Sequence, residues 1–104
     1  MNSTEQYLFA CGDFQQPEVQ DRIFGRRLAG KPDALPGFCR EPFVQPSGIS
    51  SDRVGGMVFA VTDADLAAAD AAEPPNYRRS KVETASGLLA WVYLRQDGQS
   101  AATP

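Results

Sequence analysis

The chain has 104 residues and a net charge of −3, and 42% of its residues are hydrophobic while 22% are charged. This length and this balance fit one globular domain with a single modest core, and they exclude a disordered chain. The acidic balance disfavours a nucleic-acid binder, which would present a basic face. Basic residues do cluster at 22–31, but Asp21 and Asp33 lie beside them, so we expect a solvated surface there.

Histidine is absent, and the two cysteines, Cys11 and Cys39, are far apart in the sequence. The usual zinc ligands are therefore missing, as is the usual base of serine and cysteine nucleophile chemistry. Any acid–base chemistry falls to carboxylates, tyrosines or lysines. Both thiols are expected to be small core residues of a reduced, cytoplasmic protein. No targeting segment or membrane span is apparent, so we expect a soluble chain.

The first half of the chain predicts two strands and a short helix. Residues 6–11 read as a central strand because apolar side chains fall on both of its faces. Pro17 suits the first turn of a helix over 17–24 that stops at Gly25. Residues 26–44 read as strand and turn, and 46–52 as a loop. A second strong strand follows over 56–61.

The second half predicts a helix and a hairpin. The helix ends on Glu73, and a half-exposed strand follows over 78–85. Ser86 and Gly87 suit a tight turn into a strand over 88–94, which we expect to be the most buried. We assign residues 1–95 to one domain and 96–104 to a flexible tail of small and polar residues.

The helix that ends on Glu73 carries the clearest chemical signal. Thr62 and Asp65 form the Thr-x-x-acid pattern of a capping box, which is structural. At the other end, helical spacing places Asp70 and Glu73 on the face of Leu66, so both carboxylates are expected to turn toward the interior or a cleft. Burial, the negative end of the helix dipole and the neighbouring carboxylate would all raise the pKa of Glu73. Such a group suits general-base work near neutral pH.

Two other interpretations of this helix end stay open. A glutamate at the end of a helix is commonly a solvated surface residue. Alternatively, Arg78 or Arg79 could pair with Glu73 and reverse the shift of its pKa.

Five segments, in this order, resemble the gamma-glutamylcyclotransferase-like family. They are LFACGDF (8–14), VQDRIFGRRLAGKPDALPGF (19–38), DRVGGMVFAVTDADLAAADAAE (52–73), YRR (77–79) and SGLLAWVYL (86–94). The most specific part is the helix pattern L-x-x-x-D-x-x-E, followed by Tyr-x-Arg and the final Trp-Val-Tyr strand. The resemblance implies an α+β fold, a small mixed β-barrel flanked by short helices.

The resemblance also implies an activity and its site. Glu73 matches the family's catalytic glutamate, which deprotonates the alpha-amine of a gamma-glutamyl compound. That amine then attacks the side-chain amide carbonyl of the same residue, so that 5-oxoproline forms and the other amine leaves. No metal or cofactor is implied.

The matching substrate loop is Cys11, Gly12, Asp13 and Phe14, with Tyr77 as a pocket wall or hydrogen-bond donor, or else a packed barrel tyrosine. Asp13 departs from the family, which has a small hydroxyl residue there. Its carboxylate either faces the cavity and repels a substrate carboxylate, or turns outward to cap the helix at Pro17.

We therefore predict a cyclotransferase acting on a small gamma-glutamyl amine or amide, with a small-molecule partner and neither nucleic acid nor membrane. The altered loop and a compressed segment at 39–51 leave an alternative open, an inactive relative that binds a small molecule or forms a structural oligomer. An open cavity at Glu73 would favour the enzyme, whereas a cavity filled by Phe14 or Phe43 would favour the inactive relative. The shortened segment also leads us to expect a homodimer.

Overall fold

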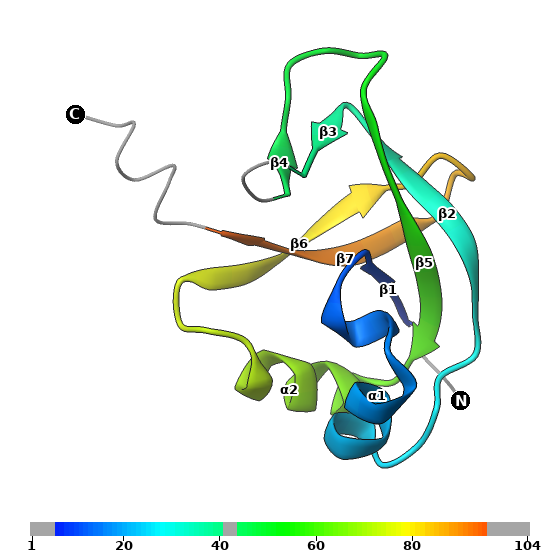
Figure 1. Ribbon diagram of the computed structural model, residues 1–104, viewed down its shortest axis with the longest axis vertical. Coiled ribbons are helices and arrows are strands. Elements are labelled where there is room, and N and C mark those ends of the chain that lie inside the picture. The colour runs from blue at the N-terminus through cyan, green and yellow to red at the C-terminus, as the bar shows by residue number, and fades with distance from the viewer. Residues whose placement is uncertain (1–5, 41–43, 96–104) are drawn as a thin grey trace.

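A computed structural model describes residues 6–40 and 44–95 of the chain. Two helices lie against a main sheet of five strands, in the order β2-β5-β1-β7-β6, with a separate two-stranded sheet of β3 and β4 (Figure 1). The elements in chain order are β1 (Gln6–Ala10), η1 (Asp13–Gln15), α1 (Pro17–Phe24), β2 (Gly30–Pro36), β3 (Phe38–Cys39), β4 (Gln45–Pro46), β5 (Arg53–Val61), α2 (Asp63–Ala72), β6 (Tyr77–Glu83) and β7 (Leu89–Arg95).

Strand β1 is central, as its two-faced apolar pattern predicts. It pairs antiparallel with β5 over its whole length and parallel with β7 at a single register pair, Leu8 with Trp91. The predicted first helix is also confirmed, since α1 starts at Pro17 and is closed by Gly25 in the left-handed conformation (φ 76°). A residue without a Cβ adopts this helix-ending geometry at little cost.

Each face of the main sheet carries its own core. On the helix side, Leu8 and Ala10 of β1 pack with buried residues of α1 and α2, among them Val19 and Leu66. On the opposite side, Phe9 packs with a set completed by the β3–β4 region. Because successive residues of a strand point to opposite faces, β1 contributes to both cores. The result is three layers, with the helices below the sheet and β3 and β4 above it (Figure 1).

The predicted α+β fold is confirmed, but the sheet is not closed into a barrel. Strands β2 and β6 are its two ends in the hydrogen-bonded order. The twist of the sheet nevertheless brings the turn between β6 and β7 against β2, where the Ala85 N–H donates to the Ala34 carbonyl at 2.8 Å. Asp33 accepts hydrogen bonds from the Thr84 and Ser86 hydroxyls at 2.7 and 2.6 Å. Among residues 6–40 and 44–95, these contacts hold the two ends together at one point.

The prediction that residues 88–94 form the most buried strand is wrong. All three of Leu8, Phe9 and Ala10 in β1 are buried, whereas β7 buries only Ala90 and Val92. The reason is position, because β1 is the middle strand of the five and β7 lies second from the end, next to the end strand β6. Strand β6 itself is half exposed, as its mixture of charged and smaller residues predicts.

Several predictions fall on residues outside the described ranges. These are the tail at 96–104, part of the compressed segment at 39–51, and Phe43. None of the described helices has the length and apolar character that crossing a membrane requires.

Candidate functional site

The start of α2 is fixed by the predicted capping box and by an ion pair. The Thr62 hydroxyl accepts from the Asp65 N–H at 3.1 Å, and the Asp65 carboxylate accepts from the Thr62 N–H at 2.8 Å. The same carboxylate accepts a hydrogen bond from each terminal nitrogen of Arg26, both at 2.7 Å. Arg26 therefore belongs to this pair and not to a purely solvated basic cluster, which the sequence pattern missed.

The end of α2 places Glu73 as the sequence predicts. Its N–H still donates to the Ala69 carbonyl at 3.1 Å, but its own backbone is extended (φ −81°, ψ 149°) and Pro74 follows. Proline disfavours helical geometry in the residue before it, so α2 stops here. The Tyr77 N–H then donates to the Pro74 carbonyl at 3.0 Å, and this turn returns Tyr77 to the same region as Glu73.

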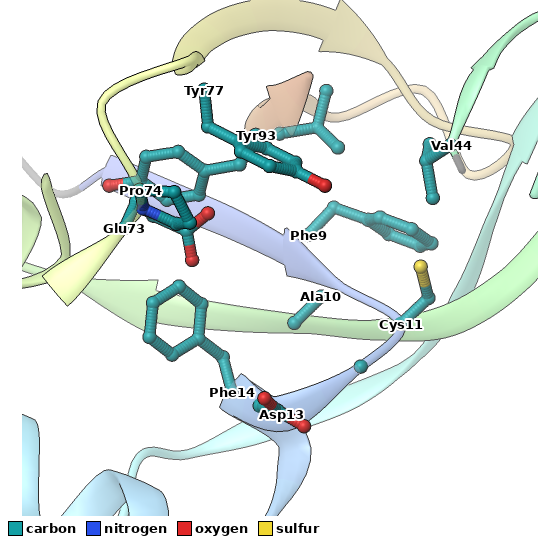
Figure 2. Close-up of a pocket in the computed structure, with 12 residues that line it drawn as sticks. Phe9, Ala10, Cys11, Asp13, Phe14, Val44, Glu73, Pro74, Tyr77 and Tyr93 are labelled. Carbon is teal, nitrogen blue, oxygen red and sulfur yellow. The ribbon is translucent and has the colours of Figure 1, made fainter. Parts of the chain in front are cut away.

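A cavity of about 340 Å³ opens at the carboxyl ends of β1 and β7. These strands share one parallel register pair, and beyond it their ends contribute Phe9, Ala10, Val92 and Tyr93 to the cavity wall. Every predicted site residue lines this cavity, although their roles stay predictions. The lining is Phe9, Ala10, Cys11, Gly12, Asp13, Phe14, Val44, Glu73, Pro74, Tyr77, Val92 and Tyr93 (Figure 2).

Glu73 has the electrostatic character expected of a general base. Burial raises the pKa of its carboxyl group, and the nearby carboxylates of Asp13 and Asp70 raise it further. No ion pair within the described part of the chain reaches Glu73. A raised pKa and the lack of a cationic partner are properties that suit a carboxylate to general-base work.

Of the two arginines that could have paired with Glu73, Arg79 is bound elsewhere. Arg79 donates two hydrogen bonds to Asp70, at 2.7 and 2.9 Å, and the Tyr93 hydroxyl donates to the same carboxylate at 2.6 Å. The side chain of Asp70 is 43% exposed and lines a shallow hollow beside the cavity. Helical spacing predicts that Asp70 turns toward the interior or a cleft, and its carboxylate lies in this shallow hollow with its donors and not in the interior.

The loop after β1 brings a second carboxylate to the cavity. Asp13 opens the turn η1 and faces the cavity from the side opposite Glu73, with the Phe14 ring between them (Figure 2). It does not cap α1, whose N-cap is Gln16 and has no side-chain hydrogen bond. Of the two alternatives, the structure thus supports the one in which Asp13 faces the cavity.

The backbone of this loop leaves hydrogen-bond donors available. The first bond of η1 runs from the Gln15 N–H to the Gly12 carbonyl at 3.0 Å. The N–H groups of Gly12, Asp13 and Phe14 precede that bond, so the turn itself gives them no partner. They are candidates to bind a negatively charged oxygen in the cavity.

Phe14 forms a wall of the cavity and does not fill it. Its ring lies 5.8 Å from the ring centroids of both Phe24 and Tyr93. Buried Gln20 fixes its backbone, donating to the Phe14 carbonyl at 2.7 Å and accepting from the Leu28 N–H at 2.9 Å. The sequence pattern missed Tyr93 as a lining residue. Tyr93 is two residues after Trp91 in the final strand, so alternation places both side chains on the same face of the sheet. Both pack against the core that contains Leu8.

No cluster of three or more cysteine, aspartate or glutamate side chains within 6–40 and 44–95 is arranged to hold a metal ion. Cys11 is a free thiol on the cavity wall, and burial raises its pKa although nearby Arg40 lowers it. The Arg40 guanidinium donates to the Cys11 carbonyl at 3.0 Å, which places a cation at the rim of the cavity.

Comparisons with known proteins agree with this geometry. Residues 8–104 match the family described as "Gamma-glutamyl cyclotransferase, AIG2-like". Two solution structures of Arabidopsis thaliana proteins, At3g28950.1 and At5g39720.1, are each 25% identical to the chain, with TM-scores of 0.78 and 0.77. The matches cover 90% and 89% of this chain but 64% and 70% of those proteins. The search of curated proteins gave no match.

Proposed function

The chain belongs to the gamma-glutamyl cyclotransferase, AIG2-like family, and from that membership we propose that it converts a small gamma-glutamyl amine or amide into 5-oxoproline. One observation carries the proposal. Glu73, a carboxylate with a raised pKa and no cationic partner in the described chain, shares a cavity with the backbone of Gly12, Asp13 and Phe14. The first group suits a base, and the second supplies donors for developing negative charge.

In the proposed reaction Glu73 accepts a proton from the alpha-ammonium group of the substrate. The freed amine attacks the gamma-amide carbonyl of the same glutamyl residue and forms a five-membered ring. The carbonyl oxygen becomes an oxyanion, which the N–H groups of Gly12 to Phe14 bind. The bond to the departing nitrogen then breaks as that nitrogen takes the proton held by Glu73. The new ring nitrogen still carries an extra proton, which it gives to Glu73, and the released amine takes this second proton up as an ammonium ion when it leaves. Because nucleophile and carbonyl belong to one molecule, much of the entropic cost is already met.

The charges at the cavity suggest how the substrate would lie. Glu73 attracts its ammonium group, whereas Asp13 repels its alpha-carboxylate. Arg40 at the rim is a described cation able to receive that carboxylate. We propose that Tyr77 forms a wall against the glutamyl group of the substrate, since it lines the cavity one turn after Glu73.

A screen for 5-oxoproline release tests the function directly. The panel is a set of gamma-glutamyl amines and gamma-glutamyl dipeptides incubated with the wild-type protein, Glu73→Gln and Glu18→Gln. Glu18 lies in the first turn of α1, exposed and away from the cavity, so its variant is the matched control. Removing a general base typically costs about 100- to 10,000-fold in rate.

We expect release by the wild type and by the control, and loss by Glu73→Gln with folding intact. Full activity in Glu73→Gln would overturn the role of Glu73. Binding of 5-oxoproline without any release across the panel would favour the inactive relative that binds a small molecule.

The homodimer and the cytoplasmic location stay proposals as well. The two end strands are poorly suited to pairing with another copy, because β2 contains Pro32 and Pro36 and β6 carries three basic side chains. A dimer would instead use a side-chain surface such as that of exposed Leu89. Sedimentation that shows only monomer at high micromolar concentration would contradict it. Cys11 is a free thiol, as in a reducing compartment.

A further inference from the structure

We propose that Asp70 is a positioning residue for Glu73: by binding the Arg79 guanidinium and the Tyr93 hydroxyl, it keeps both donors away from the Glu73 carboxylate. The catalytic meaning of this arrangement rests on the proposed function. The arrangement itself concerns the protonation of one side chain and is measurable without turnover.

Arg79 is held from two directions. Its Nε and one terminal nitrogen donate to the two oxygens of Asp70, a bidentate geometry that fixes the plane of the guanidinium. The same group lies 4.5 Å from the centroid of the Trp91 ring, which attracts cations. The Arg79 side chain is only 24% exposed. It is therefore fixed beside the cavity without forming an ion pair with Glu73.

Tyr93 shows the competition between the two carboxylates. Its ring lines the cavity with Glu73, yet its hydroxyl donates to Asp70 at 2.6 Å. Burial is the main cause that raises the pKa of Tyr93, followed by the hydrogen bond to Asp70, and the charge of Glu73 also contributes. The Tyr93 hydroxyl is thus close enough to interact electrostatically with Glu73, but it donates its hydrogen bond to Asp70.

The charged and titratable groups around Glu73 come from four elements. Asp13 of η1, Tyr77 of β6 and Tyr93 of β7 line its cavity, whereas Asp70 of α2 and Arg79 of β6 line the adjoining hollow, which shares Tyr77 and Tyr93 with the cavity. The two aspartates raise the pKa of Glu73, and the donors able to lower it are bound by Asp70. Loss of Asp70 would therefore act twice, because a like charge disappears and two donors become free.

The two effects are separated by adding a second substitution. In Asp70→Asn both operate, so the pKa of Glu73 falls furthest. In Asp70→Asn with Arg79→Gln the freed cation is absent, so part of the fall is recovered. Asp70→Glu keeps a carboxylate that can accept from both donors, so among the variants it has the Glu73 pKa closest to that of the wild type.

The experiment is an NMR titration of the Glu73 side-chain carboxyl carbon in ¹³C-labelled wild type and in these three variants. We expect the lowest midpoint in Asp70→Asn, an intermediate one in the double variant, and a near-normal one in Asp70→Glu. Equal midpoints in Asp70→Asn and the double variant would overturn the proposal. A Glu73 midpoint that is the same in Asp70→Asn as in the wild type would also overturn it. If the amide perturbs the helix end, Asp70→Ser supplies the same comparison, each fold being checked by its amide spectrum.

Turnover then tells the two proposals apart. Where wild-type protein releases 5-oxoproline, the acid limb of kcat/KM moves to lower pH in Asp70→Asn, in step with the NMR midpoint. Titrations as expected with no release from any substrate would remove the proposed function and leave the positioning role. Release of 5-oxoproline together with a Glu73 midpoint that is the same in Asp70→Asn as in the wild type would support the proposed function and remove the positioning role.

Discussion

Asp13 and Glu73 come from distant parts of the chain and face each other across one cavity, where the carboxylate of Asp13 helps to hold the pKa of Glu73 up. Asp13→Thr removes this charge. We expect affinity for gamma-glutamyl compounds to rise by up to about fivefold, since exposed charge interactions are worth about 1 kcal/mol or less. The gain shrinks with added salt, because charges in an open cavity are screened. Inhibition or binding measured at two ionic strengths checks this.

The same substitution also moves the pH profile. With Asp13 gone, the pKa of Glu73 falls, so the acid limb of kcat/KM shifts to lower pH. Lower affinity in Asp13→Thr with unchanged stability would contradict the expected repulsion and would mean that Asp13 contacts the ligand itself.

Stability of the Glu73→Gln variant has its own pH dependence. The folded state raises the pKa of Glu73 above its ordinary value of 4.5, so it binds this proton more tightly than the unfolded chain does. As the pH rises through the unfolded and then the folded pKa, the wild type loses stability that Glu73→Gln keeps. Urea unfolding at pH 4 and pH 8 therefore shows an advantage of the variant that grows with pH. An advantage that is the same at both pH values would be inconsistent with a raised pKa.

Asp65 has the opposite dependence. Hydrogen bonds from Arg26, and then from the Thr62 N–H, hold its pKa below the ordinary 3.8, so its contribution is present above that value and is lost as the pH falls through the folded pKa. Asp65→Asn costs about 1–3 kcal/mol at pH 7, less than a fully buried pair because Arg26 is half exposed. The control is Asp21→Asn in an exposed pair with Arg27, where urea unfolding detects less than about 1 kcal/mol.

Two adjacent glycines in β5 give a matched test of packing between β5 and the end of β1. A Cβ on Gly56 would lie 2.4 Å from the Ala10 carbonyl oxygen and 2.8 Å from the Phe9 ring, whereas one on Gly55 meets nothing within 4 Å. Gly56→Ala therefore destabilises by about 1–3 kcal/mol and displaces the end of β1 beside the cavity. Gly55→Ala is close to neutral. Thermal unfolding and substrate affinity together check both, and equal effects would refute the contact.

The sequence predicts those parts of the site that depend on local rules. The capping box at Thr62 and the stop imposed by Pro74 set both ends of α2, and therefore the place of Glu73. The resemblance to the family then paired Glu73 with the loop at Gly12. Each of these inferences uses residues within one element or a pattern of segments in order.

Partnerships between distant elements could not be predicted in this way. Arg26 reaches Asp65 because α1 packs against α2, and Arg79 meets Asp70 because β6 returns beside the end of α2. Helical spacing places Asp70 on the inward face of α2, but its carboxylate binds Arg79 and Tyr93 in the hollow beside the cavity, which spacing along one helix does not predict. The open sheet likewise depends on how far the strands twist, a property of the whole sheet.

The contact of Asp33 with Thr84 and Ser86 has a consequence for folding kinetics. It joins segments about fifty residues apart and accompanies a single backbone bond between Ala85 and Ala34, so closing this loop is entropically costly and brings little return until the sheet exists. Contacts of this kind are expected to form after the rate-limiting step. Loss of the Asp33 carboxylate would then leave the refolding rate nearly unchanged and accelerate unfolding, so that Asp33 sets the lifetime of the native protein.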